Sequence, residues 1–207
     1  TQKTGVEIKY ITGKEGALLE RLKAEDKNTP ADMLITVDAG NLWHAAQEGV
    51  LQPVKSDTLE AAIPDNLRDP DGNWFGLSVR ARTIVYNTKE VDPGLLNSYE
   101  ELSSDAWQGK LVLRTSKKVY NQSLVASLIA EHGEDQTAQI VKGWVNNLAA
   151  APFSNDTKAL EAVAAGIGQV TIVNTYYFGR LMKKKPELPL AIFWPNQEKG
   201  GVHMNVS

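Results

Sequence analysis

The sequence has 207 residues and no cysteine, with 42% hydrophobic residues and 22 basic against 25 acidic side chains. The length and apolar content suffice for one large domain or two small ones. The net charge of −3 argues against a binder of nucleic acid or of anionic membranes, because such proteins normally carry a basic surplus. The lack of cysteine excludes disulfides, thiolate metal sites and cysteine nucleophiles.

Strand and helix patterns alternate over the first 50 residues. Apolar and polar residues alternate at 6–11, which predicts a strand, and leucines at helical spacing predict a helix over 17–26. The nearly continuous apolar run at 33–37 is typical of a buried parallel strand. A short helix is expected at 42–47.

The pattern continues after a proline-containing irregular stretch at 50–73. Residues 74–87 form one extended segment, longer than the usual strand of roughly 5 to 6 residues. Asn155 and Asp156 are capping candidates for the helix that follows them. Beyond the extended segment we expect strands at 111–115, 170–174 and 190–194, a further strand at the end of the sequence, a short helix within 95–109, and helices at 122–132, 135–148 and 156–165.

This alternation predicts an α/β protein with a largely parallel sheet. The long extended segment suggests two α/β lobes joined by crossovers, with a ligand cleft between them. We expect one lobe to comprise residues 1–82 with residues 196–207 returning to it, and the other to comprise residues 83–195.

Common catalytic and metal motifs are missing. His44, His132 and His203 are scattered without the spacing of a zinc site, so no histidine-based metal site is expected. The sequence contains neither a GxSxG elbow nor a GxxxxGK[ST] phosphate loop. The lysines at 183–185 are interpreted as a solvated helix end.

The tyrosines are the unusual feature. Tyr176 and Tyr177 directly follow a predicted buried strand, at the end where open α/β sheets place their ligands. Tyr120 follows another strand, and Arg80 and Arg82 alternate on the long extended segment, so they emerge on one face. Each feature alone is more often a matter of packing or of solvation. Together they indicate a site for a hard cation and an anion.

The chemistry of these side chains supports that interpretation. A phenol normally titrates near pH 10, so a phenolate at neutral pH needs a strong local cation, which a trivalent metal supplies. Anionic oxygen ligands suit hard, highly charged ions. Arginine would hold a synergistic anion, or balance the phenolate charge, through its forked donors.

At these residues the sequence resembles a known family, the periplasmic ferric-ion-binding proteins of ABC importers of the FbpA and FutA type. The tyrosine pair after a strand, together with RAR and YNxS upstream, is highly specific in combination. The resemblance covers nearly the whole chain and is carried by residues 30–34 and 37–40, 74–82, 120–124, 174–177 and 201–207.

The resemblance implies a two-lobed periplasmic binding protein of type II, each lobe a mixed, mostly parallel sheet flanked by helices. It implies that Tyr120, Tyr176 and Tyr177 coordinate Fe(III). Arg80 and Arg82 would lie near the iron or the anion, and Arg180 would support them. A synergistic anion such as carbonate is expected at the same site.

The family's biology sets further expectations. The chain would be a monomeric carrier in the periplasm, not an enzyme, and would deliver iron to an ABC permease in the inner membrane. Family members begin with a strand ending in a tyrosine-containing loop and continue past the motif that ends at Ser207, so we expect this chain to be incomplete at both ends.

Three alternatives stay open. Iron(II) is conceivable as the physiological ligand. A carrier of a small oxyanion or a polyamine on the same scaffold would keep Arg80 and Arg82 but has no use for three convergent phenols. An α/β enzyme could use Tyr177 as a general acid, but it needs a partner base that the sequence does not offer.

Overall fold

The computed structural model describes residues 4–207, which divide into two compact units. Unit 1 comprises residues up to Leu77 together with Ser207, and unit 2 comprises Ser78–Val206. The second unit thus includes residues 78–82 and 196–206, which the sequence analysis assigned to the first lobe. The lobe boundaries themselves remain predictions. No described helix is long and apolar enough to cross a membrane.

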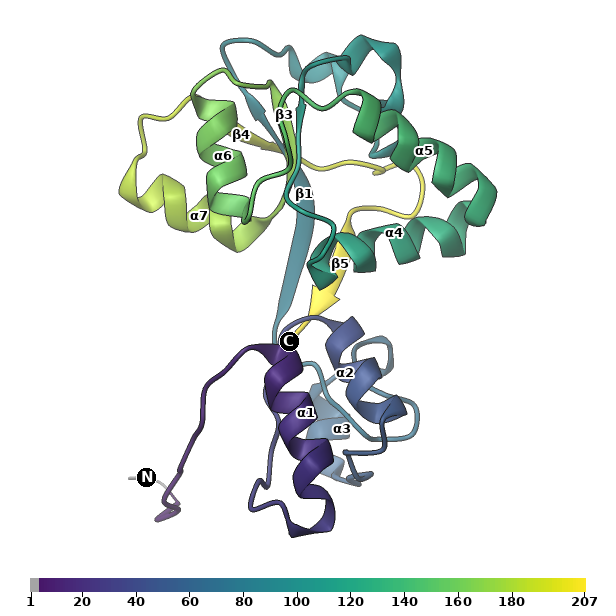
Figure 1. Ribbon diagram of the computed structural model, residues 1–207, viewed down its shortest axis with the longest axis vertical. Coiled ribbons are helices and arrows are strands. Elements are labelled where there is room, and N and C mark those ends of the chain that lie inside the picture. Colours follow the sequence, from purple (N-terminus) through teal and green to yellow (C-terminus); the bar gives the residue numbers. More distant parts are fainter. Residues whose placement is uncertain (1–3) are drawn as a thin grey trace. The chain divides into compact units, whose positions relative to one another are not determined.

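Unit 2 is built around one central strand, β1 (Val79–Asn87), which is shown in Figure 1. Strand β3 (Val170–Asn174) pairs antiparallel with it, and β2 (Leu111–Val112) pairs parallel with β3. On β1, the second half pairs with β4 (Leu190–Phe193) and the first half with β5 (His203–Val206), both antiparallel.

The expected mixed sheet is confirmed, but the expectation that it is mostly parallel is wrong. Among the described strands, three of the four pairings are antiparallel. The reason is the position of β1: it runs through the middle of the sheet, opposite in direction to each of its three partners.

Helices cover both faces of this sheet (Figure 1). Ile84 and Ile172 pack in one apolar cluster with residues of α4 (Val119–His132) and α5 (Glu134–Asn146). The next residue on each strand belongs to a second cluster, with α6 (Asp156–Ala164) and α7 (Thr175–Lys184). Because successive side chains of a strand point to opposite faces, two buried strands supply both halves of the core.

Unit 1 is helical in its described part. Asp38 accepts a hydrogen bond from the Gly40 amide and caps the helix that begins at Ala39, and Ser56 caps the helix that begins at Asp57 through the Leu59 amide. The α-helices of this unit are α1 (Glu15–Glu25), α2 (Ala39–Gln47) and α3 (Asp57–Ala62). Short 3-10 turns complete both units at Asp26–Asn28, Asp65–Leu67, Pro93–Leu95, Glu100–Ser103 and Asp105–Trp107.

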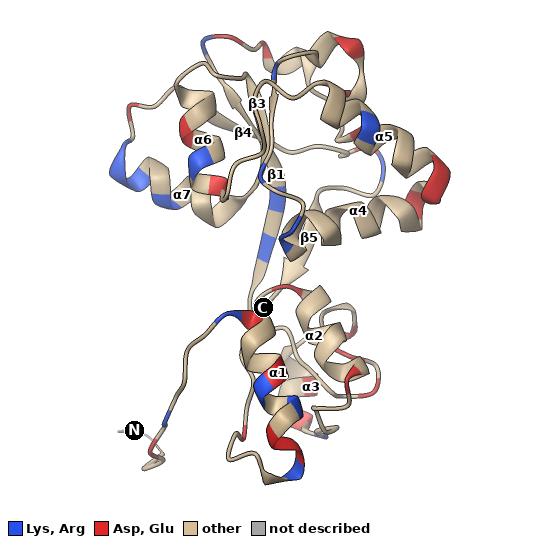
Figure 2. Cartoon of the chain, in the orientation of Figure 1, with Lys and Arg blue, Asp and Glu red and all other residues tan. Residues whose placement is uncertain are grey.

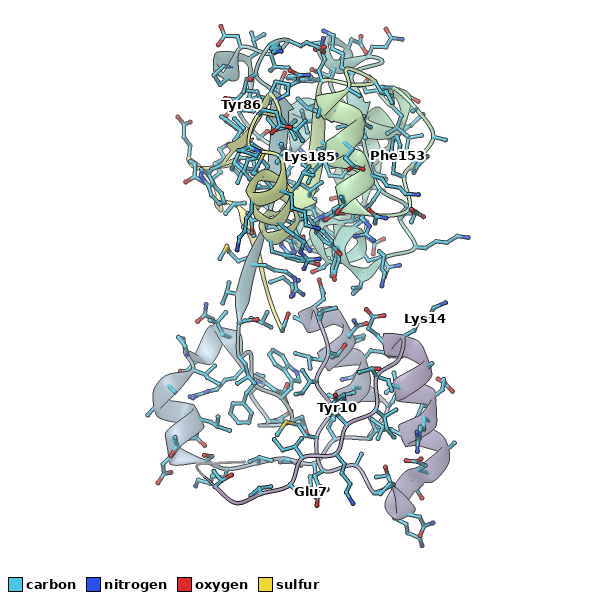
Figure 3. All side chains as sticks on the ribbon, turned by 90° about the vertical axis from the view of Figure 1, so that its left-hand side faces the viewer. Glu7, Tyr10, Lys14, Tyr86, Phe153 and Lys185 are labelled. Atoms are coloured by element: carbon cyan, nitrogen blue, oxygen red, sulfur yellow. The ribbon has the colours of Figure 1, made fainter. Side chains whose placement is uncertain are left out.

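Two predicted strands of unit 1 are wrong. Residues 6–11 and 33–37 form no strand, and several of their apolar side chains face solvent: Tyr10 is 82% exposed, Met33 74% and Ile35 72%. Figure 3 labels Tyr10 on the segment that precedes α1. A strand needs a hydrogen-bonded neighbour, and neither segment pairs with another strand in the described part of the chain.

Most other elements agree with the sequence to within a few residues, but β1 begins five residues after the start of the extended segment predicted at 74–87, α3 lies in the stretch predicted as irregular, and only the lysine end of α7 was expected to be helical. The strand predicted at 111–115 is shorter, at Leu111–Val112, and α4 begins three residues earlier than expected. The helix expected within 95–109 is a series of 3-10 turns. The earlier start of α4 matters for the site, because it places Tyr120 inside the first turn of that helix.

Candidate functional site

Three tyrosines from two helix N-termini come together in unit 2. The hydroxyl oxygen of Tyr120 lies 3.4 Å from that of Tyr176, and the ring centroids of Tyr176 and Tyr177 are 4.1 Å apart. Tyr120 is buried, and the other two side chains are half-buried. The structure therefore gathers the three tyrosines that the sequence singled out.

The local secondary structure determines the positions of the three tyrosines, each of which lies in the first turn of a helix. The buried strand β3 is followed directly by α7, so Tyr176 and Tyr177 lie in the first turn of α7. Tyr120 is the second residue of α4. The first turn of a helix carries the positive end of the helix dipole. Both helices therefore favour negative charge near these phenols.

Two arginines flank the ring of Tyr120. The Cζ atom of Arg80 lies 5.3 Å from the ring centroid and that of Arg114 lies 5.2 Å from it. Arg80 also donates a hydrogen bond of 3.1 Å to the Val206 carbonyl, which ties it to β5. Figure 2 shows the basic positions along β1. Guanidinium groups at such distances attract the face of a phenol ring and stabilise its ionised form.

A third arginine lies near the rings of Tyr176 and Tyr177. Arg180, one turn further along α7, has its Cζ atom 5.8 Å from the ring centroid of Tyr176 and 6.0 Å from that of Tyr177. Its side chain is exposed, so it brings positive charge to the solvent side of the cluster.

Arg82 has a different place from Arg80. It is 2% exposed, and its guanidinium donates to Asp156 at 3.2 Å and to the side-chain oxygens of Asn174 at 3.1 Å and Asn121 at 2.5 Å. Asn121 directly follows the first tyrosine of the cluster, and Asn174 lies two residues before the second. Arg82 therefore does not face the phenol rings directly but holds in place the two chain segments that carry the phenols.

Asp156 joins this network to a second buried arginine. Its carboxylate accepts hydrogen bonds from Arg82 at 3.2 Å, from Arg114 at 3.0 Å and from the backbone amide of Asn174 at 2.9 Å. All three side chains are nearly inaccessible to solvent. Two cations thus share one anion, which leaves a net positive charge beneath the tyrosines.

Arg114 and Asp156 were not expected at the site from the sequence. Asp156 was interpreted only as a capping candidate, and the cap itself comes from Asn155, whose side-chain oxygen accepts the Lys158 amide at 3.0 Å. Arg114 lies at the end of a predicted strand, next to the Tyr120 segment, and a charged residue in an otherwise apolar run was the one available signal.

Tyr120 and Tyr176 do not ionise easily by themselves, because the pKa of each is raised. Burial raises the pKa of Tyr120, and the nearby Tyr177 adds to this, although the hydrogen bond from Tyr176 opposes it. Burial also raises the pKa of Tyr176, and the adjacent hydroxyls of Tyr120 and Tyr177 raise it further. A bound cation of high charge reverses this balance, because it stabilises each phenolate that contacts it.

A polar link connects α4 to β5 beside the cluster. The hydroxyl of Ser123, one turn after Tyr120, lies 3.1 Å from Nε2 of His203 and accepts a hydrogen bond of 2.5 Å from Asn205. Burial, together with the charges of Arg82 and Arg80, lowers the pKa of His203 to about 4. His203 is therefore neutral at neutral pH.

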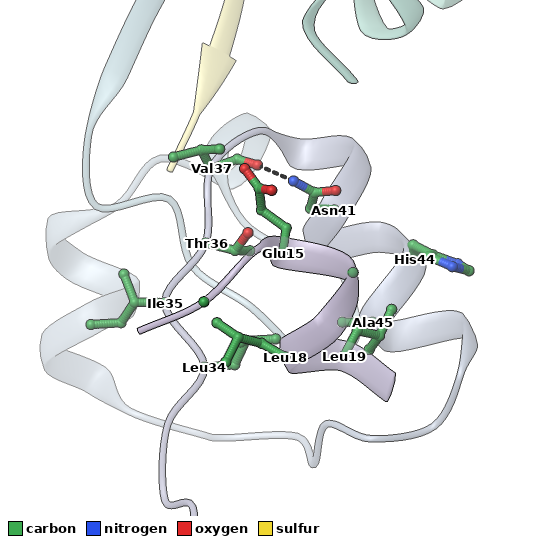
Figure 4. A pocket seen from close by; sticks show the side chains of 12 residues that line it. Glu15, Leu18, Leu19, Leu34, Ile35, Thr36, Val37, Asn41, His44 and Ala45 are labelled. Atoms are coloured by element: carbon green, nitrogen blue, oxygen red, sulfur yellow. Dashed lines mark hydrogen bonds between the residues drawn. The ribbon is translucent and has the colours of Figure 1, made fainter. Parts of the chain in front are cut away.

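Unit 1 contains a pocket of its own, which is drawn in Figure 4. Its wall includes Leu18, Leu34 and Ala45, and Asn41 closes one end by donating a 2.6 Å hydrogen bond to the Val37 carbonyl. Glu15 is the one carboxylate in this mostly apolar lining, which therefore lacks the several anionic ligands that a hard cation prefers. None of the six site residues expected from the sequence belongs to it.

Residues 28–206 of the chain match a family described as bacterial extracellular solute-binding protein. The chain is 47% identical to iron uptake protein A1 of Synechocystis sp., with all of this chain and 59% of that protein covered. It spans less than two thirds of the length of the first curated relatives that it matches.

Solved structures show the same likeness. Trichodesmium IdiA (FutA) in complex with iron and citrate ligands is 48% identical and superimposes with a TM-score of 0.95, over 100% of this chain and 67% of that one. The ferric binding protein from Campylobacter jejuni is 38% identical, with a TM-score of 0.93 over 100% of this chain and 67% of that one. The chain shares the α/β fold of these two-lobed proteins.

Proposed function

This chain belongs to the family of bacterial extracellular solute-binding proteins, and from that premise we propose that it is part of the iron(III)-binding component of an ABC importer. The observation that carries the proposal is the contact between phenols from two helix N-termini, with the Tyr120 and Tyr176 hydroxyls 3.4 Å apart and Tyr177 stacked beside them. Relatives named for iron uptake and for ferric binding support the choice of metal.

Ferric iron fits the donor set. Three phenolate oxygens are hard anionic ligands, which prefer a hard cation of high charge. Tyr120 and Tyr176 hold their protons more tightly than ordinary phenols, so these two hydroxyls stay protonated until such a cation displaces the protons. Binding thus releases protons, and the affinity for iron falls as the pH falls.

The arginines fit a small anion bound together with the iron. Three phenolates cancel the charge of one Fe(III), and Arg180 adds positive charge beside the rings of Tyr176 and Tyr177 that a small anion can meet. A planar guanidinium binds an oxyanion such as carbonate through two parallel hydrogen bonds. Arg82 fills a supporting role, because Asp156 and two asparagines already engage it.

The protein acts as a carrier that hands iron to a membrane permease, outside the cytoplasmic membrane as its family's description indicates. An enzymatic role for Tyr177 would require a base within reach. The ring contacts of the three tyrosines are with other phenols and with arginines, which suit metal and anion binding.

A ferric titration followed by visible absorbance tests this function. Ferric iron is supplied to the chain as a weak chelate near neutral pH, and we expect a broad phenolate-to-iron charge-transfer band. The band should disappear in the double variant Tyr176→Phe and Tyr177→Phe. It should also weaken when the titration is repeated at lower pH, since protons compete for the ligands.

Tyr10→Phe is the matched control. It removes one hydroxyl from an exposed tyrosine of unit 1 and should leave the band unchanged. Circular dichroism shows whether each variant is folded. The proposal fails if the folded chain gives no band, or if the band survives loss of both hydroxyls at 176 and 177.

A further inference from the structure

A second group of metal-ligating side chains lies at the other end of α4. Nε2 of His132 is 2.7 Å from a carboxylate oxygen of Glu100 and 3.9 Å from one of Glu131. One ligand atom from each of the three lies within 4.8 Å of the others. Figure 2 shows the acidic positions where α4 meets α5.

Hydrogen bonds from Asn196 orient the Glu100 carboxylate. The side-chain amide of Asn196 donates to both of its oxygens, at 3.2 and 2.9 Å, and the oxygen of the same amide accepts the backbone N–H of Tyr99 at 3.0 Å. Asn196 has a positive φ of 59°, so the loop after β4 adopts an uncommon conformation at this point. Metal-ligating carboxylates are typically oriented by such outer hydrogen bonds.

The distances suit one small cation. Ligand bonds of roughly 2.0 to 2.1 Å in a tetrahedral zinc site place neighbouring ligand atoms about 3.3 Å apart. The contacts of His132 to Glu100 and Glu131, at 2.7 and 3.9 Å, lie on either side of that value. Small side-chain rotations therefore close the group around an ion, with water in the remaining position.

We propose that Glu100, Glu131 and His132 form a binding site for a divalent transition-metal cation of the zinc type. An imidazole nitrogen with two carboxylates is a zinc donor set, whereas calcium and magnesium prefer oxygen ligands alone. The negative end of the α4 dipole, at which His132 stands, adds to the attraction for a cation.

This site is distinct from the tyrosine cluster. His132 is twelve residues after Tyr120 on the same helix, which corresponds to about 18 Å along its axis. A metal at His132 would join three parts of unit 2: the last turn of α4, the 3-10 turn that begins at Glu100, and the loop that contains Asn196. Binding would therefore stabilise unit 2 against unfolding.

Zinc titration by calorimetry tests the proposal. The metal-free full chain with Tyr176→Phe and Tyr177→Phe is used, so that zinc has no tyrosine pair to bind. We expect one zinc ion per chain. Added to this parent, His132→Gln or Glu131→Gln should each lower the affinity at least about tenfold, and Asn196→Gly, which keeps the positive φ but removes the amide, should lower it about tenfold.

Glu134→Gln is the matched control, because it removes an exposed carboxylate two residues beyond His132 without touching the group. Its zinc affinity should stay that of the parent. A cobalt(II) titration of the same parent gives an independent readout, since a tetrahedral site produces intense visible bands that His132→Gln should abolish.

The proposal is overturned if the folded parent binds no zinc, in which case the three side chains form hydrogen bonds only. It is also overturned if His132→Gln and Glu131→Gln bind zinc as well as Glu134→Gln does. Neither result bears on ferric binding at the phenols, because the calorimetric parent lacks two of them.

Discussion

Two apolar runs of this chain are similar in sequence but differ in structure and burial. Residues 33–37 in unit 1 and Val170–Asn174 in unit 2 are both short, nearly continuous apolar runs. In unit 2 the run is a fully buried strand between β1 and β2. In unit 1 it forms no strand, and Ile35 is 72% exposed whereas Ile172 is 1% exposed.

The difference teaches that an apolar run becomes a strand only when it has partners on its edges and cover on its faces. Strand β3 has hydrogen-bonded neighbours on both edges, and helix pairs pack over both faces. That frame also holds the site, because β3 leads directly into the helix that carries Tyr176 and Tyr177. Stability and function are therefore coupled in unit 2.

The largest effect is expected from Asp156→Ala. The substitution leaves Arg82 and Arg114 buried without their shared anion, which should cost about 3 to 5 kcal/mol of unfolding free energy. Hydrogen exchange followed by mass spectrometry is the measurement, since it reports on each segment. Protection should fall in β1 and β3 and stay unchanged in α1.

Asp156→Asn provides the comparison for that experiment. The amide keeps the shape and one acceptor oxygen but not the charge, so it separates the loss of charge from the creation of a cavity. A loss below about 1 kcal/mol with Asp156→Ala would show that the two arginines do not depend on this carboxylate.

A second pair of variants tests the two apolar runs directly. Ile172→Ala removes a buried side chain and should destabilise the protein by about 2 to 5 kcal/mol. Ile35→Ala removes an exposed one and should change stability by less than about 0.5 kcal/mol. Urea unfolding of both variants gives the two values. Equal losses would mean that Ile35 is buried in solution and that the contrast between the units is false.

The third and smallest effect concerns pH. The pKa of His203 falls from an ordinary value of 6.5 to about 4 on folding, so between those values the unfolded chain binds more protons than the folded one. His203 therefore causes no loss of unfolding free energy above pH 6.5, and the unfolding free energy decreases as the pH falls from 6.5 toward 4. The loss amounts to at most about 3 kcal/mol, reduced by the partial exposure of the ring.

Denaturant unfolding at several pH values between 7 and 4.5 measures this loss. His203→Gln keeps a polar side chain but cannot titrate, so its stability should fall less steeply over the same range. Parallel curves for the two proteins would contradict the assignment, because other groups would then account for the whole pH dependence.

The sequence anticipated much of the site through local patterns. The pair Tyr176 and Tyr177 after a buried strand, and Tyr120 near a helix start, were visible as residues at strand ends. Helices α4, α5 and α6 were placed to within a few residues because their apolar spacing is local, whereas only the lysine end of α7 was expected. The start of α7 at Thr175 confirms that the tyrosine pair lies directly at a strand end.

Other features could not be seen in the sequence because they join residues far apart along it. Arg82 meets Asp156 across 74 positions, and Glu100 meets His132 across 32. The three histidines had no metal-site spacing, and only the fold brought Glu100 to His132, which already has Glu131 as its neighbour in the sequence. The direction of the strands was decided in the same way, by where β1 lies in the sheet.

By itself, then, the sequence determined the periodicity of the elements and the residues at their ends, because both follow from chemistry repeated over a few neighbouring positions. The tertiary structure decided which of the apolar runs are buried. It also decided that Arg82 holds the segments that carry the phenols and that Glu100 approaches His132. These outcomes depend on contacts between distant segments, and such contacts form only when strands have partners and helices have a sheet to cover.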